Sequence, residues 1–267
     1  MVDTTVTLVE RGHIRTDLNH IIEGAALGHE ENPNPETQML EGPVYNVVID
    51  HPEATVLWDT GSHPEAGQGH WPAELYAAFE HYDAHEHRLA DDLADAGYSV
   101  EDVDCVLQTH LHLDHAGGLH EFEGTDVPVV VHEEELKYAY LSAKSDAGSD
   151  AYVAADFDRD LNWRVLSRDR ATLYEDFEVI RLPGHTPGVL GTKLDLDDHG
   201  TVIFAGDQAY VRENYDREEP LGAGLLWSGR DWRESLSLVK ELERRHDATV
   251  ICGHDAADAE TIRNELP

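Results

Sequence analysis

The chain has 267 residues, of which 40% are hydrophobic, so it can bury a substantial core and is neither disordered nor a minimal scaffold. Its 55 acidic and 19 basic residues give a formal net charge of −36. Because no basic cluster occurs along the sequence, we expect no nucleic-acid partner and no anionic membrane partner. The acidic residues are spread over the whole chain, which favours a solvated surface suited to high salt and predicts a halophilic source.

Short β-rich runs alternate with helical stretches along the chain. The predicted strands are residues 5–9, 44–49, 55–58, 103–108, 127–132, 177–182, 192–196, 201–205 and 248–252. The predicted helices are residues 73–82, 88–96, 133–141 and 231–245. Residues 51–54 form a short Pro-containing turn between two strands, which predicts a hairpin. Because no linker or internal repeat interrupts the pattern, we expect one domain over residues 1–267.

Four of the predicted strands are followed by a His or an Asp set among Gly, Pro or Thr residues. The runs read VDCVLQTHLHLDHAGG, FEVIRLPGHTP, TVIFAGDQAY and ATVICGHD. Strands that end together at one edge of a sheet bring side chains from distant parts of the sequence to a single site. We therefore expect these polar residues to converge.

The first of these runs carries four ligand-type side chains within six residues, His110, His112, Asp114 and His115. Imidazole nitrogens bind borderline divalent ions at about 2.0–2.1 Å, and a carboxylate can join or bridge such ions. Chance alone would give roughly 0.01 occurrences of H-x-H-x-D-H in a chain of this composition. Four ligand-type groups in so short a run predict a site for two metal ions.

The H-x-H-x-D-H motif, followed by isolated His185, Asp207 and His254 after successive strands, resembles the metallo-β-lactamase superfamily. The resemblance implies an α/β fold, a four-layer αββα sandwich. It also implies two ligand sets that share a bridging Asp207: His110, His112 and His185 for one ion, and Asp114, His115 and His254 for the other. Asp59, in a D-T-G run, would fix the orientation of the ligand imidazoles without binding a metal ion itself. Zinc is the expected metal, with iron, cobalt and manganese as alternatives.

Several segments between about Val44 and Asp255 resemble N-acyl-homoserine lactonases. They are the AGYSVED run, the PGHTPG turn, and GDQAY with the RENY run that follows it. In that family a Tyr three residues after the bridging Asp points into the site, and Tyr210 stands at this position. The resemblance implies a metal-dependent lactonase in which a hydroxide between the ions attacks the ring carbonyl, Tyr210 stabilises the oxyanion and Asp114 protonates the leaving alkoxide. Many of these lactonases have Phe where this chain has Leu113, so we expect a wider pocket.

The metal motif does not determine the substrate, so other activities of the superfamily stay as alternatives. A glyoxalase II-type thioester hydrolase gathers basic residues for glutathione, and the last third of this chain offers few beyond Arg230, Arg233, Arg244 and Arg245. A nuclease would need a basic face. An iron-dependent oxidoreductase is a further alternative, although its diiron branch commonly has Glu in place of His112. A non-catalytic metal-binding module would lack an open position for water.

The remaining predictions concern partners, location and individual side chains. We expect a small lactone as substrate, a cytoplasmic location because no signal peptide or apolar run of about 18 residues is visible, and leave a homodimer open. Cys105 and Cys252 lie in apolar runs and are expected to be buried thiols without a disulfide. Histidines 81, 85 and 87 are expected to face solvent. Residues 63–87 are interpreted either as an apolar lid for an acyl chain or as core packing.

Overall fold

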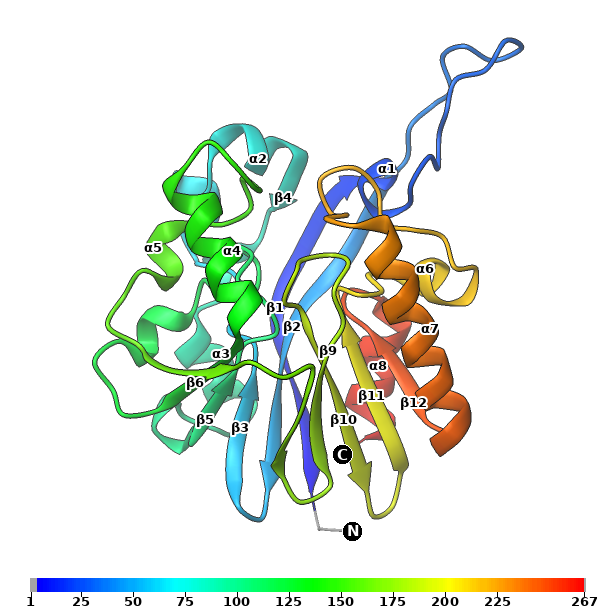
Figure 1. The fold of residues 1–267 in the computed structure, drawn as a ribbon. Coiled ribbons are helices and arrows are strands. Elements are labelled where there is room, and N and C mark those ends of the chain that lie inside the picture. Colours follow the sequence, from blue (N-terminus) through cyan, green and yellow to red (C-terminus); the bar gives the residue numbers. More distant parts are fainter. Residues whose placement is uncertain (1–3, 267) are drawn as a thin grey trace.

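The computed structural model describes residues 4–266, so residues 1–3 and 267 of the predicted domain lie outside the described part. A seven-stranded sheet and a five-stranded sheet face each other (Figure 1). The larger sheet has the order β4 (Phe79–His81), β1 (Thr5–Asp17), β2 (Met39–His51), β3 (Ala54–Trp58), β5 (Cys105–Leu107), β6 (Pro128–His132) and β7 (Asn162–Leu166). The smaller sheet has the order β12 (Thr249–Cys252), β11 (Gly200–Gly206), β10 (Leu190–Leu196), β9 (Phe177–Arg181) and β8 (Arg170–Tyr174).

Strand direction changes within each sheet. Strands β1, β2 and β3 are antiparallel, and β2 and β3 form the hairpin predicted around residues 51–54. Strands β3, β5, β6 and β7 are parallel, as are β11 and β12. The carboxyl ends of parallel strands lie at the same edge of a sheet, which is where loops can assemble a site.

Helices cover the outer faces of both sheets. The helices are α1 (Leu18–Ile21), α2 (Ala73–Ala78), α3 (Leu89–Asp95), α4 (Glu133–Lys144), α5 (Ala154–Phe157), α6 (Arg212–Asp216), α7 (Gly229–His246) and α8 (Ala256–Glu265), with short 3-10 turns at Ala66–Gln68, Ala84–Glu86, Val100–Asp102 and Leu119–Phe122. Apolar residues of α3, α4 and α5 pack on the larger sheet, and those of α7 pack on the smaller sheet (Figure 1). The layers are therefore helix, sheet, sheet, helix, as predicted.

The central core lies between the two sheets. Trp58 of the larger sheet is 2% exposed, lies against Phe204 of the smaller sheet, and donates a hydrogen bond from Nε1 to Thr192 Oγ1 at 3.2 Å. Cys105 and Cys252 are buried and free, as expected. Within the described residues, no helix combines the length and apolarity that a membrane span requires.

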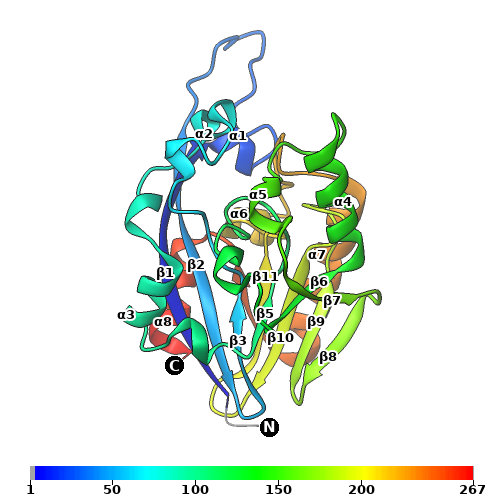
Figure 2. The ribbon, with the colours of Figure 1, turned by 90° about the vertical axis from the view of Figure 1, so that its left-hand side faces the viewer.

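Each predicted strand is present, but several elements differ from the predictions. The helix predicted for residues 73–82 ends at Ala78, because Phe79–His81 pairs with β1 as an edge strand. Strand β1 continues to Asp17 through a bulge at Gly12, which has a positive φ of 90°. The sequence patterns missed strands β7 and β8, helix α8 and the short helices α1, α5 and α6. The segment between α1 and β2 projects from the body of the molecule in both views (Figures 1 and 2).

Candidate metal centre

Four loops that follow strands bring all the predicted ligand residues together. The loop after β5 carries four of them, and the loops after β9, β11 and β12 carry one each. Each of these residues is buried, with at most 7% of the residue's surface exposed: His110, His112, Asp114, His115, His185, Asp207 and His254. The convergence expected from the strand ends is therefore observed.

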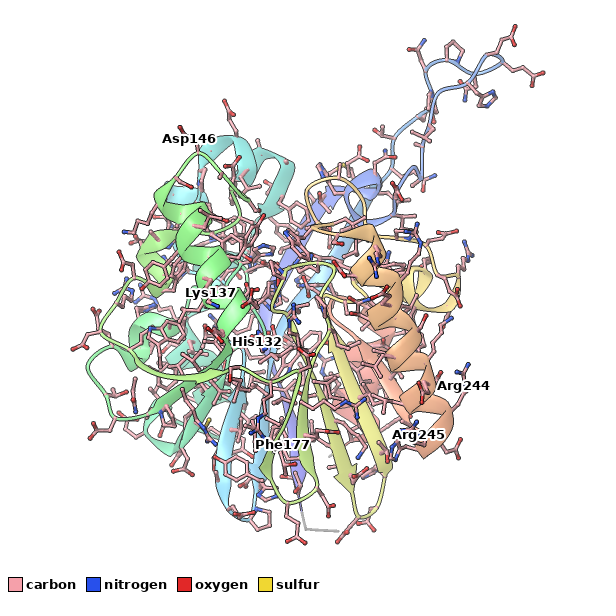
Figure 3. The ribbon with its side chains drawn as sticks, in the orientation of Figure 1. His132, Lys137, Asp146, Phe177, Arg244 and Arg245 are labelled. Carbon is pink, nitrogen blue, oxygen red and sulfur yellow. The ribbon has the colours of Figure 1, made fainter. Side chains whose placement is uncertain are left out.

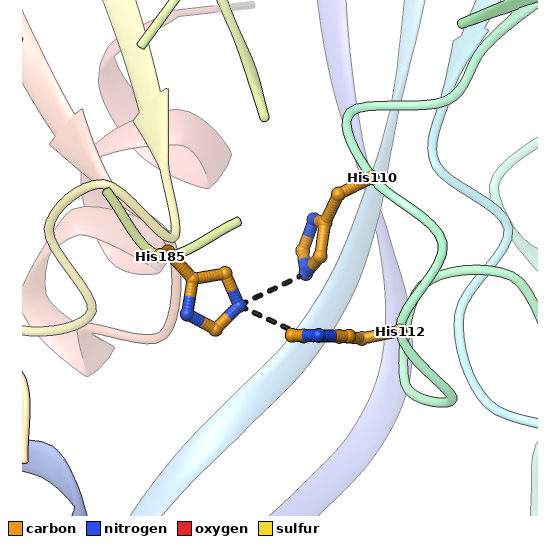
Figure 4. Close-up of side chains that lie close together, drawn as sticks. All are labelled: His110, His112 and His185. Atoms are coloured by element: carbon orange, nitrogen blue, oxygen red, sulfur yellow. Dashed lines mark hydrogen bonds between the residues drawn. The ribbon is translucent and has the colours of Figure 1, made fainter. Parts of the chain in front are cut away.

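The first half of the centre consists of three imidazoles from two loops. His185 Nε2 lies 3.2 Å from His110 Nε2 and 2.9 Å from His112 Nδ1 (Figure 4). Ligand atoms bound at about 2.0–2.1 Å to a tetrahedral ion lie about 3.3 Å from one another. The spacing of these three nitrogens therefore fits one divalent ion.

The second half is formed by Asp114, His115 and His254, whose ligand atoms also lie close together. Asp114 Oδ2 is 3.7 Å from His115 Nε2 and 3.8 Å from His254 Nε2. Asp207 faces both halves with different oxygens. Its Oδ2 is 3.4 Å from His185 Nε2, whereas its Oδ1 is 3.3 Å from His254 Nε2. A carboxylate in this position can bind two ions at once.

Unpaired buried atoms support the fit to metal ions. His115 Nε2, His254 Nε2 and Asp207 Oδ1 are buried and have no hydrogen-bond partner among the described residues. Buried polar atoms are normally paired, so three unpaired atoms that face one another fit the binding of a cation between them. Nitrogen and carboxylate donors without a thiolate suit zinc and similar borderline ions.

The other ring nitrogens of these histidines are oriented by oxygen acceptors. His185 Nδ1 donates to the carbonyl oxygen of Leu225 at 2.6 Å, and His254 Nδ1 donates to that of Pro43 at 2.8 Å. A proton on Nδ1 leaves the Nε2 lone pair free for a metal ion. Burial and the neighbouring imidazoles hold the pKa of His110 well below its usual value, so this ring is a neutral donor.

Asp59 lies behind the centre, as the sequence predicts. Its Oδ2 accepts hydrogen bonds from His115 Nδ1 at 2.8 Å and from Thr109 Oγ1 at 2.7 Å, and its Oδ1 accepts from the Thr109 backbone N–H at 2.7 Å. Asp59 is fully buried and has a positive φ of 59°. A strained backbone at such a position is typical of a functional site.

Tyr210 is 1% exposed, and its hydroxyl has no hydrogen-bond partner among the described residues. Burial, with the nearby carboxylates of Asp114 and Asp207, raises the pKa of this phenol well above its ordinary value. The side chain therefore stays protonated and keeps a hydrogen available for donation.

A cavity of about 440 Å³ opens beside the two ligand sets. Leu113 forms part of its wall, together with aliphatic and aromatic groups of other segments. The lining residues outside the candidate ligands are His20, Leu75, Ala78, Phe79, Leu113, Tyr138, Gly148, Ser149, Asp150, Ala151, Tyr210, Gly224, Leu225, Leu226 and Trp227. No Lys or Arg of residues 4–266 lines this cavity.

Residues 63–87 divide between the two roles considered for them. Leu75 and Phe79 line the cavity, whereas Trp71 is 1% exposed and packs in the core. The prediction that His81 faces solvent is wrong, because its ring is buried and its Nδ1 lies 2.7 Å from Ser62 Oγ. His85 is exposed as predicted, and His87 is half-buried beside Asp92.

The sequence interpretation missed Glu135 and Tyr152. Glu135 is fully buried and accepts a hydrogen bond from the Leu111 backbone N–H, between two candidate ligands. Tyr152 packs edge-on against His112, with ring centroids 4.6 Å apart. Glu135 has no sequence signal, because an acidic residue in the first turn of a helix is ordinary. Tyr152 belongs to none of the motifs that the sequence analysis identified.

A comparison with models of known protein families shows to which family the chain belongs. Residues 39–254 match the family model described as the metallo-beta-lactamase superfamily. The chain belongs to this superfamily. The fold class predicted from the motif is therefore confirmed.

Curated members of the superfamily include lactonases similar to this chain over most of their length. An N-acyl homoserine lactonase AiiB of Agrobacterium fabrum is 28% identical over 257 residues, which cover 93% of this chain and 92% of the relative. An N-acyl homoserine lactonase of a Bacillus species is 27% identical over 226 residues, which cover 82% and 83% of the two chains. The resemblance to N-acyl-homoserine lactonases is thus confirmed.

Solved structures of the superfamily show the same fold. An N-acyl homoserine lactone hydrolase with the product N-hexanoyl-L-homoserine at its catalytic metal centre has a TM-score of 0.83 and 22% identity, with 98% of this chain and 97% of that chain covered. AidC, a dizinc quorum-quenching lactonase, has a TM-score of 0.67 and 16% identity, with 96% of this chain and 89% of that chain covered.

The cytoplasmic location, the halophilic source, the single domain and the homodimer stay predictions.

Proposed function

We propose that this chain is a metal-dependent hydrolase that opens the ring of N-acyl-homoserine lactones or related lactones. The observation that carries the proposal is the cavity, which joins two sets of ion ligands to mostly apolar walls without a Lys or Arg among the described residues. An uncharged cyclic ester with an acyl chain matches this lining. Lactonases among the relatives act on such esters according to their names.

Two divalent ions at the centre would supply a hydroxide that is nucleophilic near neutral pH and would polarise the ester carbonyl. His110, His112 and His185 would hold one ion, Asp114, His115 and His254 would hold the other, and Asp207 would contribute to both sites. Zinc is the proposed metal in both positions, with iron, cobalt and manganese as the alternatives that these donors accept.

Tyr210 and Asp114 have the proposed catalytic roles. The Tyr210 hydroxyl, which is buried and unpaired, donates a hydrogen bond to the ring carbonyl and to the oxyanion formed from it. Asp114 Oδ2 faces His115 and His254, so Oδ1 is the oxygen left to carry a proton. Both residues line the cavity, and from there Asp114 can protonate the leaving alkoxide.

The basic residues considered for a glutathione thioester lie elsewhere. Arg244 and Arg245 lie near the carboxyl end of α7 and are exposed, with Arg244 pointing outward (Figure 3). Arg230 pairs with Glu234, and Arg245 pairs with Glu241 on the same helix. Because no Lys or Arg of residues 4–266 lines the cavity, that part of the chain offers no basic side chain there for the carboxylates of glutathione.

A substrate panel tests the proposal. Purified, metal-loaded protein is given N-hexanoyl-homoserine lactone, a glutathione thioester and a phosphodiester under the same conditions. The proposal predicts the largest kcat/KM for the lactone, above about 10⁴ M⁻¹s⁻¹, the lower edge of usual enzyme efficiency. A larger value for the thioester would instead support the glyoxalase II-type alternative.

A further inference from the structure

Glu135 is a buried carboxylate outside the candidate ligand sets. It lies in the first turn of α4, its side chain is fully buried, and no ion pair involves it among the described residues. Removing a carboxylate from water costs several kcal/mol unless hydrogen bonds replace its hydration. Its position therefore calls for a specific set of donors.

Four donors from three segments surround this carboxylate. Glu135 Oε1 accepts from the Leu111 backbone N–H at 3.0 Å and from the Tyr152 hydroxyl at 2.8 Å. Oε2 accepts from Thr186 Oγ1 at 2.5 Å, and the Gly188 backbone N–H donates to the same carboxylate. Both oxygens of this buried carboxylate thus accept hydrogen bonds that replace contacts with water.

Three of these donors, all except Tyr152, belong to the two loops that form the first half of the centre. Leu111 stands between His110 and His112, and Thr186 directly follows His185. A single carboxylate thereby connects the segments of all three imidazoles. The ring of Tyr152, which the same carboxylate holds, packs edge-on against His112.

The close approach of these segments depends on Gly188. A Cβ atom at Gly188 would lie 2.2 Å from the backbone nitrogen of Glu135, so only glycine lets the turn after His185 reach α4. The other half of the centre has a different carboxylate behind it, because Asp59 accepts the hydrogen bond from His115 Nδ1. Each half is thus backed by one buried acid.

We propose that Glu135 is a positioning residue for the first half of the metal centre, formed by His110, His112 and His185. It fixes the loop after β5 relative to the turn after β9, so that three imidazole nitrogens are held at ligand spacing before an ion binds. This inference rests on the two-ion centre of the proposed function. Outer hydrogen-bond partners of metal ligands typically change metal affinity by about 10- to 100-fold.

The test measures zinc bound per chain over a series of buffered free-zinc concentrations, by elemental analysis. Glu135→Gln should weaken one of the two binding steps by about 10- to 100-fold and leave the other unchanged, because an amide nitrogen cannot accept from the donors that face it. Glu133→Gln is the matched control, since Glu133 lies in the same helical turn and pairs with Lys137 on the surface. It should bind zinc as the wild type does.

Variants that lack one half identify the affected step. With His254→Ala, only the first half is complete, and adding Glu135→Gln should weaken zinc binding. With His185→Ala, only the second half is complete, and adding Glu135→Gln should change nothing. Equal weakening in both backgrounds, or none in either, overturns the proposal.

Two further measurements separate other causes of failure. Tyr152→Phe removes one donor and keeps the packing, so it should give a smaller loss in the same binding step, and an unchanged step would contradict the proposal. This variant decides the question if Glu135→Gln does not fold, as judged by circular dichroism. A wild-type chain that binds no zinc would overturn the two-ion centre itself rather than the role of Glu135 alone.

Discussion

The phenol ring of Tyr210 stacks on the imidazole of His254, with ring centroids 4.0 Å apart and planes inclined by 20°. The two residues come from loops after neighbouring parallel strands, β11 and β12. A backbone hydrogen bond from His254 N–H to the Tyr210 carbonyl, at 2.8 Å, fixes the pair. The hydroxyl, which has no hydrogen-bond partner among the described residues, is thereby held beside a candidate metal ligand.

Replacing Tyr210 by Phe should lower kcat for lactone opening by up to about 10²-fold, the lower end of the loss seen when an oxyanion donor is removed. Zinc content and melting temperature should stay at wild-type values, because the hydroxyl pairs with no protein atom among the described residues. Steady-state kinetics and elemental analysis of the same preparation check both expectations. A loss of zinc would show that the side chain holds the metal centre rather than the substrate.

Leu113 should set how much room the cavity leaves for an acyl chain, because it is buried in the cavity wall. Leu113→Phe should lower kcat/KM for a dodecanoyl lactone by about tenfold relative to a butanoyl lactone, the scale of a small steric change in a pocket. Leu113→Met is the control, since it conserves volume and should leave the ratio unchanged. An unchanged ratio in the Phe variant would place the acyl chain elsewhere.

Stability should fall in acid because of a cluster of histidines formed by His63, His70 and His120. His63 stacks on His70 with centroids 3.8 Å apart, and burial together with charges on His70 and His120 lowers the pKa of His63 to about 4. Between pH of about 6.5 and 4 the unfolded chain binds a proton at this site that the folded chain does not, so stability falls as the pH falls.

Melting temperatures of the wild type and of His63→Gln, measured from pH 7.5 to pH 4 in the same buffers, check this expectation. The variant should lose less stability over this window, because it has no imidazole to protonate. Parallel curves for the two proteins would mean that His63 contributes nothing to the acid sensitivity.

The melting temperature should rise between dilute buffer and molar KCl. In dilute buffer the acidic side chains of a protein with a net charge of −36 repel one another. Salt weakens this repulsion, because the Debye length falls from about 10 Å at 0.1 M to about 3 Å at 1 M. Exposed ion pairs such as that of Lys137 with Glu133 are screened as well, but such pairs contribute little to stability. A melting temperature that stays constant or falls would contradict the predicted adaptation to salt.

The ligand residues could be predicted because short sequence motifs identify them without knowledge of the fold. His110, His112, Asp114 and His115 occupy one short run, and each later ligand follows a strand that hydrophobic patterning identifies. Their convergence then follows because these strands end at the same edge of the sheets.

Other features depend on contacts between distant segments. Residues 79–81 continue a helical pattern, yet pairing with β1 turns them into a strand and buries His81. Strands β7 and β8 lie at sheet edges with mostly exposed or half-buried side chains, so their hydrophobic signal is weak. Glu135 resembles any acid at a helix start until the loops that donate to it are in place.

The most direct test of the account is ring opening of N-hexanoyl-homoserine lactone at molar KCl, followed by mass spectrometry. Zinc-loaded, chelated and reloaded samples of one preparation are compared, with bound metal measured in each. The account predicts a product heavier by one water with the loaded protein, its loss on chelation and its return with zinc. Protein that holds two ions per chain and leaves the lactone intact would contradict the proposed function.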